Sequence, residues 1–245
     1  GHVFDLARQG YVSLFGGGSR ANTGDTAAMV GARERFLGRG HYDRIAQAVS
    51  DAIEPDARGL CVDLAGGTGH YLATVLDHHP ELLGLDLELS TFALRRAARA
   101  HDRIAAVAAD VWQRWPVRTG TAAAAISVFG PRNLAELGRV LAADGRFIVV
   151  TPTVRHLTEL VERLGLVTVD PRKPERLEQQ LARWHIESVT VLDYAVELSH
   201  RDVLDAVLMG PSAHHVDGAV LAATVQVMPE PVTVTVSVSV TVAGS

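Results

Sequence analysis

The sequence predicts an α/β fold, a doubly wound parallel sheet with antiparallel strands at one side. From about residue 59 onward, short apolar segments alternate with amphipathic helical segments, as in successive βαβ units. A glycine-rich turn, "DLAGGTG", joins the first of these strands to the helix that follows it. Two longer alternating stretches, "ESVTVLDYAVEL" and "VTVTVSVSVTV", come near the C-terminus and predict an antiparallel pair.

Composition fits one large domain, or one domain with a small appendage. The chain has 245 residues, of which 47% are hydrophobic, so it can bury a sizeable core. No apolar run reaches the roughly 18 residues of a membrane span, and no signal peptide is recognisable, so we expect a cytoplasmic location without membrane contact. Cys61 is the only cysteine, which excludes a disulfide framework. The net charge of −5 argues weakly against nucleic acid as partner.

The segment 1–55 is predicted to be a helical lead-in, separate from the sheet-bearing unit over 56–245. Its first helix has Thr23 or Asp25 as expected N-cap, and Gly38 or Gly40 as expected stop. "HYDRIAQAVSDAI" supplies a second helix. In the sheet-bearing unit we expect strands at 59–64, 81–86, 104–108, 122–129, 145–151, 187–198 and 232–242, and helices at about 69–77, 90–100, 134–142 and 155–164.

The glycine turn brings backbone N–H groups and a helix N-terminus to the carboxyl edge of the sheet, where such folds bind ligands. A dinucleotide fingerprint is disfavoured, because Leu72 stands where its third glycine is required. A P-loop is excluded, because no Gly-Lys-Ser or Gly-Lys-Thr follows the turn and Lys173 is the only lysine. The pattern therefore leaves a ligand without a pyrophosphate.

Acidic residues follow three successive predicted strands. Asp63 precedes the glycines, Asp86 closes the next strand at a position suited to a ribose diol, and Asp110 is placed to receive an adenine amine. Together with Gly66 and Gly69, these acids favour S-adenosylmethionine as the cofactor. An ordinary surface turn with surface aspartates is the alternative.

Several stretches outside the sheet resemble the 23S rRNA guanine-N1 methyltransferases, a family that includes the macrolide-resistance (tylosin-type) enzymes. The similarity runs in order along nearly the whole chain and implies a class I S-adenosylmethionine-dependent methyltransferase fold. It is carried by "HVFDLARQGYV" at 2–12, "MVGARERFLGRGHY" at 29–42, "VDLAGGTGHY" at 62–71, "GLDLE" at 84–88, "TPTVRHLTEL" at 151–160 and "MGPSAHH" at 209–215.

The resemblance also assigns cofactor contacts to Tyr42, to Gly67 with Thr68, and to His156. Ala65 stands where the commoner pattern has glycine, and its methyl group is tolerable if the residue keeps a negative φ. Members of the family begin with a zinc module of three cysteines and one histidine, and His2 corresponds to its last ligand. We therefore expect no metal site within these residues, and zinc only if a cysteine module lies upstream of this chain.

The segment "SVFGPRN" leaves the fourth predicted strand beside the expected methyl group. We expect Phe129 and Pro131 to wall a pocket for the target base, and Arg132 or Asn133 to touch its edge or a phosphate. Methyl transfer needs alignment and no protein nucleophile, but the proton on guanine N1 needs an acceptor. The candidates for this base are His214, Asp25 and His41.

The sequence leaves the function open among three classes. The first is an rRNA guanine-N1 methyltransferase, acting in macrolide resistance or in housekeeping. The others are a small-molecule methyltransferase without an RNA module and a non-catalytic cofactor-binding relative. A basic helix with Arg95, Arg96, Arg99 and Arg103 is either a solvated face or a phosphate contact. A homodimer is compatible with this function, because two subunits can share a concave RNA-binding cleft.

Overall fold

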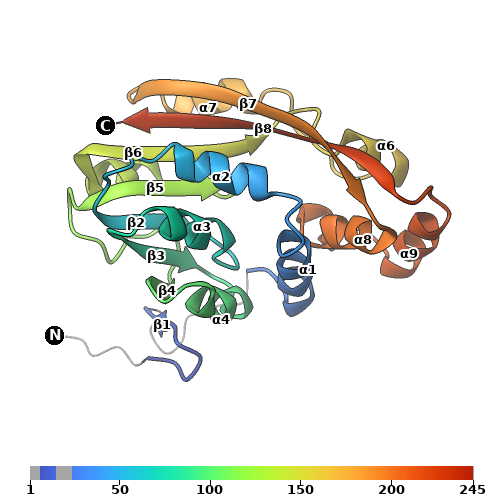
Figure 1. Cartoon of the computed structure of the whole chain (residues 1–245), viewed down its shortest axis with the longest axis horizontal. Helices are drawn as coiled ribbons and strands as arrows, with labels where there is room; N and C mark the ends of the chain where they lie inside the picture. The colour runs from blue at the N-terminus through green and yellow to red at the C-terminus, as the bar shows by residue number, and fades with distance from the viewer. Residues whose placement is uncertain (1–5, 15–23, 245) are drawn as a thin grey trace.

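The computed structural model describes residues 6–14 and 24–244. In this part of the chain, strands form a single sheet in the order β1-β4-β3-β2-β5-β6-β8-β7 (Figure 1). The strands are β1 (Val12–Ser13), β2 (Gly59–Leu64), β3 (Leu82–Glu88), β4 (Ile104–Ala108), β5 (Ala122–Val128), β6 (Leu141–Pro152), β7 (His185–Leu198) and β8 (Val232–Gly244). The helices are α1 (Ala27–Leu37), α2 (Asp43–Asp51), α3 (His70–His78), α4 (Thr91–Ala100), α5 (Leu134–Val140), α6 (Thr158–Leu164), α7 (Lys173–Gln180), α8 (His200–Leu208) and α9 (Gly218–Gln226), with a 3₁₀ turn η1 (Pro211–His214).

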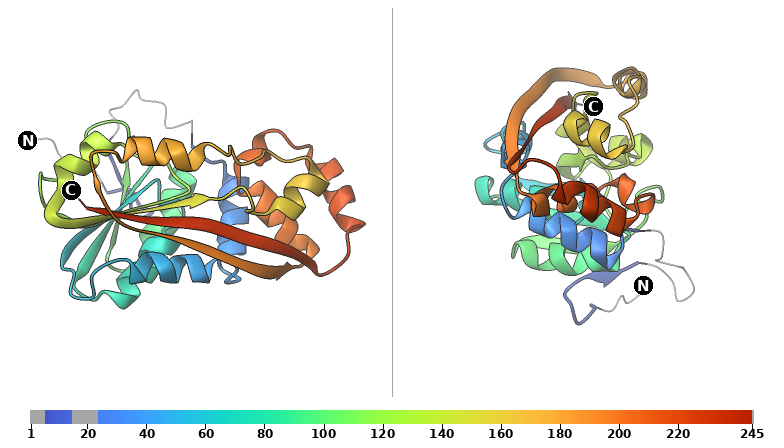
Figure 2. Two further views of the ribbon diagram at one scale, coloured as in Figure 1. Left: turned by 90° about the horizontal axis from the view of Figure 1, so that it is seen from above. Right: turned by 90° about the vertical axis from the view of Figure 1, so that its right-hand side faces the viewer.

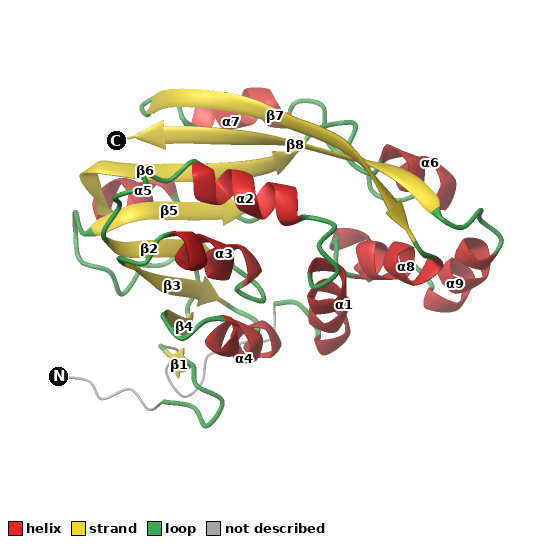
Figure 3. Ribbon diagram, viewed as in Figure 1, coloured by secondary structure: helices red, strands yellow, loops and turns green. Residues whose placement is uncertain are grey.

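The sheet is parallel from β1 to β6, and β8 is antiparallel to both β6 and β7. This confirms the predicted parallel sheet and its antiparallel pair. Strand β8 pairs with β6 only over Val238–Gly244, while its pairing with β7 continues to Val232. The two strands therefore run past the end of β6, and α8 and α9 lie beyond the carboxyl edge of the sheet (Figure 3).

Both faces of the sheet are covered by helices, so the core has two main layers (Figures 1 and 2). On one face, α2 and α3 bury Val49 and Leu72 against the sheet. On the other face, α5 and α7 bury Leu137 and Leu177, with Trp115 packed among them. Burial of such side chains contributes roughly 1.5 to 3 kcal/mol each. This double coverage is what the predicted alternation of strands and helices requires.

Local signals explain most helix boundaries. Ser90 caps α4, Asn133 caps α5 and Ser199 caps α8, each by accepting a backbone N–H with its side chain. The N-cap of α1 is Thr26, whose hydroxyl accepts from Met29 N at 3.3 Å, so the expectation of Thr23 or Asp25 was wrong. Thr23 lies outside the described residues. Gly38 ends α1, as predicted.

Two elements were not predicted, β1 and α7. Strand β1 has two residues and α7 is largely polar, so neither gives a clear periodic signal. The sequence also predicts helical material between the last two strands, around "MGPSAHH", and α8, η1 and α9 lie there. Strand β6 begins at Leu141 instead of about 145. The division of the chain at residue 55 stays a prediction.

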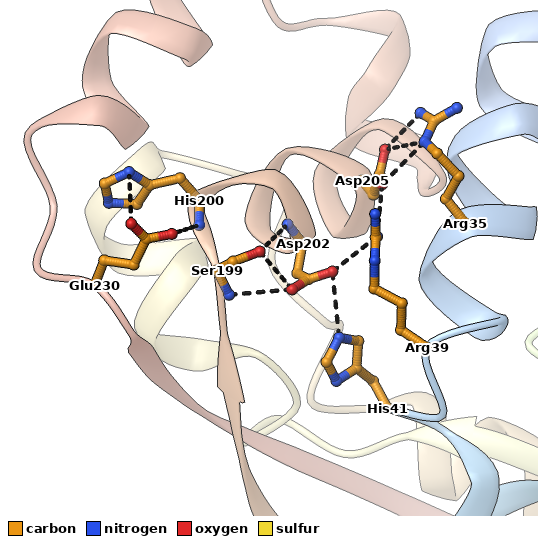
Figure 4. Close-up of polar contacts among 8 residues, drawn as sticks. All are labelled: Arg35, Arg39, His41, Ser199, His200, Asp202, Asp205 and Glu230. Atoms are coloured by element: carbon orange, nitrogen blue, oxygen red, sulfur yellow. Dashed lines mark hydrogen bonds and ion pairs between the residues drawn. The ribbon is translucent and has the colours of Figure 1, made fainter.

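Charged side chains hold α1 against α8, beyond the carboxyl edge of the sheet (Figure 4). The guanidinium of Arg35 donates from Nε and Nη2 to the carboxylate of Asp205, with the shortest contact 2.6 Å. Arg39, one turn later, lies 2.8 Å from Asp202 and 3.1 Å from Asp205, and His41 lies 3.3 Å from Asp202. Both carboxylates are buried, so this network fixes how α1 sits over the sheet edge.

Replacing Asp205 by asparagine is expected to lower the free energy of unfolding by roughly 2 kcal/mol, because charge-assisted hydrogen bonds to two arginines are lost. Arg35 is 43% exposed, so water replaces part of the loss. Urea denaturation measures the change. Asp51→Asn, at an exposed carboxylate bonded to Gln47, is the control and is expected to change stability by less than about 0.5 kcal/mol. Equal stabilities of the Asp205 variant and the wild type would contradict this role for the network.

Candidate active site

The turn after β2 leaves the sheet through left-handed backbone. Ala65, Gly67 and Gly69 have φ values of +55°, +65° and +76°. Ala65 therefore does not meet the condition of a negative φ, and its methyl group is held in a conformation that costs about 1 to 2 kcal/mol. Its N–H donates to Leu87 O at 2.8 Å, which ties the turn to β3. Strain of this kind at a strand end is typical of a functional site.

Carboxylates surround this turn. Asp63 and Asp86 are partners in the register of β2 and β3, and both are buried. Gly66 N donates to Asp86 Oδ1 and Gly67 N donates to Glu88 Oε2, each at 3.1 Å. The second oxygens of Asp63 and Asp86 are buried without a hydrogen-bond partner among the described residues. Buried acceptors without donors indicate a place that a donor-bearing ligand would complete.

Glu88 is the member of this group that the sequence interpretation missed. It ends β3, is 8% exposed, and also accepts from Leu89 N at 2.7 Å and Ser90 N at 2.8 Å. The sequence "DLELS" at 86–90 does contain a pattern that indicates a role for Glu88. Glu88 shares a strand face with Asp86 through the two-residue period, and it precedes the helix cap Ser90 by two residues.

The carboxyl groups favour protonation in the free protein. Burial, and then the charge of Glu88, raises the pKa of Asp63 to about 8. Burial and the charge of Asp63 raise the pKa of Asp86 well above its usual range. Because the folded state holds a proton that the unfolded state releases above about pH 4, its stability falls as the pH rises toward 8.

We therefore expect the melting temperature of the ligand-free protein to fall between about pH 5 and about pH 8, and Asp63→Asn to flatten that fall. Differential scanning fluorimetry across this range measures both. A melting temperature that rises with pH, or an equal slope in the variant, would contradict the assignment of the proton to Asp63.

An aromatic group lies at the ends of the neighbouring strands β5 and β6. The hydroxyl of Tyr42 lies 3.0 Å from His156 Nε2, and the ring of Phe129 lies 6.0 Å from Tyr42 and 5.6 Å from His156 between centroids. Ser237 N donates to His156 Nδ1 at 3.3 Å, and burial lowers the pKa of His156 to about 4. His156 is therefore neutral and carries its proton on Nε2, which donates to Tyr42.

Phe129 is the exposed member of this group. Its φ is +57°, which bulky residues adopt only under strain, and its side chain is 40% exposed although its neighbours Tyr42 and Ser127 are buried. Its N–H donates to Val150 O at 3.0 Å, which holds the strained residue on β6. A Cβ built on the next residue, Gly130, would lie 3.7 Å from Ala65 Cβ, so the fold presents an exposed aromatic ring beside the glycine turn.

Comparisons with known proteins fit this geometry. No family model matches the chain. A 23S rRNA (guanine(748)-N(1))-methyltransferase of Streptomyces fradiae is 44% identical over 94% of this chain and 83% of its own length. A protein of Micromonospora griseorubida, provisionally named a 23S rRNA (guanine-N(1)-)-methyltransferase, is 47% identical over 95% of this chain and 84% of its own. The chain belongs to the 23S rRNA guanine-N1 methyltransferase family.

Solved structures show the fold of this methyltransferase. The YcgJ protein of Bacillus subtilis matches with a TM-score of 0.56 at 11% identity, covering 82% of this chain and 97% of that one. Geranyl diphosphate C-methyltransferase of Streptomyces coelicolor, solved with S-adenosyl-L-homocysteine, matches with a TM-score of 0.52 at 14% identity, covering 86% and 84%. The predicted class I methyltransferase fold is confirmed.

The residues at the turn fit S-adenosylmethionine, on which the methyltransferase depends. The unpartnered oxygens of Asp63 and Asp86 are acceptors for hydroxyl or ammonium donors. Glu88, two residues after Asp86 at the end of β3, is a third acceptor. A Cβ built on Gly66 would lie 2.5 Å from Asp86 Oδ1, so glycine keeps these carboxylates close to the backbone. The glycines let a ligand come close to the backbone of the turn, and the turn itself contains no lysine or arginine that would bind a phosphate.

Other predicted residues lie elsewhere on the edge or are already engaged. Asp110 follows β4 by two residues and accepts from Trp112 N at 2.9 Å. Thr68 is buried in the turn. Asn133 caps α5, and Arg132 Nε donates to Gln180 Oε1 at 3.3 Å. Pro131 is exposed beside Phe129.

The three candidates for the general base differ in their surroundings. His41 lies 3.3 Å from Asp202, and its ring is tilted against that of Phe36 with 4.9 Å between centroids. Asp25 is paired with Arg33. His214 is exposed on η1. His2 lies outside the described residues.

The predicted basic helix α4 is not one uniform charged face. Arg103, just beyond it, donates to main-chain oxygens of the α3–β3 connection, including Leu82 O at 2.6 Å. Arg96 pairs with Glu34 of α1 at 2.9 Å, and Arg95 lies 5.8 Å from the ring of Phe92. At least two of the four arginines are therefore committed to the protein itself.

Residues 6–14 and 24–244 lack two further kinds of feature, a membrane-spanning helix and a metal-binding cluster. No helix there is both long and apolar enough to cross a bilayer. No group of three or more histidine, cysteine, aspartate or glutamate side chains there is arranged to hold a metal ion.

Proposed function

We propose that this protein transfers the methyl group of S-adenosylmethionine to N1 of a guanine in a hairpin loop of 23S rRNA. The exposed ring of Phe129 beside the buried carboxylates of the glycine turn carries the proposal, since it puts a base-stacking surface next to a cofactor site. The names of relatives at 44% and 47% identity support the same reaction. A cytoplasmic location follows from an rRNA substrate.

The cofactor half of the site is formed by the turn and its surroundings. S-adenosylmethionine, when bound, supplies an electrophilic methyl group on a sulfonium. Glu88 and Asp86 accept hydrogen bonds from the ribose, Asp63 accepts from the remaining donors, and Asp110 contacts the adenine. Tyr42 and His156 border the methyl-bearing end. The remaining contacts come from the backbone of the turn, at Gly66, Gly67, Thr68 and Gly69.

The substrate half lies at the end of β5. The target base leaves its stack, since an enzyme cannot reach N1 inside paired RNA, and packs on Phe129 with Pro131 beside it. Arg132 contacts the base edge or a phosphate. Because Asp25 is paired with Arg33 and His41 lies against Asp202, His214 is the remaining candidate for receiving the N1 proton.

Methylation of N1 blocks the Watson–Crick edge of guanine, so reverse transcription stops at the modified nucleotide. Incubating the protein with labelled S-adenosylmethionine and unmodified 23S rRNA is expected to give N1-methylguanosine by mass spectrometry and one new stop. Label in a metabolite but not in RNA would favour a small-molecule methyltransferase. Binding of the cofactor without any transfer would favour a non-catalytic relative.

The physiological role and the assembly are separate parts of the proposal. Resistance to macrolides is the role that the family resemblance implies, and a housekeeping modification is its alternative. Expression in a macrolide-sensitive host lacking the modification separates them, because only the first raises the inhibitory concentration. A homodimer that shares an RNA-binding cleft would appear in light scattering with rRNA at two chains per complex.

A further inference from the structure

The side chain of Arg33 lies across the outer face of the glycine turn. A Cβ built on Gly67 would be 3.2 Å from Arg33 Nη1 and 3.6 Å from its Cδ. Arg33 belongs to α1, which is far in sequence from the turn, and its side chain is 26% exposed. A cation thus faces the same backbone whose N–H groups bond to the carboxylates of β3.

The position of Arg33 is fixed from several sides. Its Nη2 donates to Met209 O at 2.7 Å, and Nη1 pairs with Asp25. The helix that carries it is itself held on α8 by Arg35 and Arg39 (Figure 4). A guanidinium held in this way loses little further conformational freedom when a ligand binds.

The charges around the turn leave one role for this cation. Three carboxylates supply acceptors, but S-adenosylmethionine also carries a carboxylate of its own, which needs donors. Burial lowers the pKa of His70, at the start of α3, which disfavours a second cation at the turn. Arg33 has five N–H donors, and its bonds to Asp25 and Met209 engage two of them.

We propose that Arg33 binds the carboxylate of the amino-acid half of the cofactor. The assignment rests on the proposed function, because it takes S-adenosylmethionine as the ligand of the turn. Arg33 would then fix the end of the cofactor opposite the adenine and so set the direction in which the methyl group points. Planar, two-point contact with a carboxylate is the geometry that a guanidinium favours.

A cycle of two proteins and two ligands tests this. Calorimetry compares wild type with Arg33→Gln, using S-adenosylhomocysteine and its decarboxylated form, which keeps every other group. The wild type is expected to bind the complete ligand about 10 to 100 times more tightly than the decarboxylated one. Arg33→Gln should bind the two ligands equally, within about twofold. Arg33→Lys keeps the positive charge but loses the paired N–H donors of the guanidinium, so it should retain part of the preference for the complete ligand.

The outcomes separate this assignment from the proposed function. If the wild type binds neither ligand, the cofactor proposal fails. If the wild type binds both and Arg33→Gln keeps the full preference, Arg33 does not contact the carboxylate. Equal weakening of both ligands in Arg33→Gln would also overturn the assignment, because it would mean that Arg33 only shapes the turn. Should Arg33→Gln not fold, an unchanged preference in Arg33→Lys overturns it. Arg96→Gln, at an arginine outside the turn, is the control and should bind both ligands like the wild type.

Discussion

Replacing Gly66 by alanine is expected to abolish measurable binding of S-adenosylmethionine, a loss of at least about 100-fold in affinity. The added Cβ would lie 2.5 Å from Asp86 Oδ1 and 2.6 Å from Asp63 Cγ, well inside ordinary contact. Both carboxylates are buried between β2 and β3 and have no room to retreat. The added methyl group must therefore displace the carboxylates of Asp63 and Asp86, which are the proposed acceptors of hydrogen bonds from the cofactor. Isothermal titration calorimetry measures the affinity, and circular dichroism checks that the variant is folded.

Gly218→Ala is the matched control. Gly218 begins α9, and a Cβ there meets no atom within 4 Å, so the same chemical change is expected to leave cofactor binding unaltered. Wild-type affinity in a folded Gly66→Ala protein would show that the carboxylates do not form the cofactor site.

Replacing Phe129 by alanine is expected to lower kcat/KM for rRNA methylation about 10 to 100-fold while leaving the affinity for S-adenosylmethionine within about twofold. Stacking of a base on an aromatic side chain is worth about 1 to 3 kcal/mol, which corresponds to that range. The ring is 40% exposed, so its removal leaves no large cavity in the core. A filter-binding assay of methyl transfer gives the rate, and calorimetry gives the affinity.

Two further variants separate the ring from the backbone at this position. Phe129→Gly also removes the ring but tolerates the φ of +57°, so it should lose activity equally and be more stable than the alanine variant. Phe92→Ala, at a phenylalanine of similar exposure on α4, should keep full activity. An equal loss of rate and of cofactor affinity in Phe129→Ala would show that the ring belongs to the cofactor site instead.

Most of the fold could be predicted from the sequence, because the strands are short, apolar and regularly spaced. The glycine turn, the parallel strands and the long alternating pair all have periods that a single sequence shows. Helix α7 was not predicted because its helical state depends on tertiary packing, and Leu177 is its one buried residue. The extension of β7 and β8 past β6 also follows from pairing between distant segments.

The site residues at the ends of strands could be predicted from the sequence. Those brought to the site by packing of elements distant in sequence could not. Asp63 and Asp86 were expected from the spacing, and their register confirms that they are neighbours. Glu88 was overlooked because Asp86 had already satisfied the pattern. Arg33 had no local signal at all, since only the docking of α1 on α8 brings it to the turn. The left-handed backbone at Ala65 likewise depends on its bond to Leu87 and not on its residue type.

A crystal structure of the protein with S-adenosylhomocysteine tests the central claim most directly. The claim is that the buried carboxylates at the glycine turn hold the methyl donor. We expect the ribose hydroxyls within hydrogen-bond distance of Glu88 or Asp86, and the thioether sulfur between the turn and Phe129. Electron density for the ligand at another place, with the bonds from Gly66 and Gly67 to the carboxylates intact and no ligand over them, would contradict it.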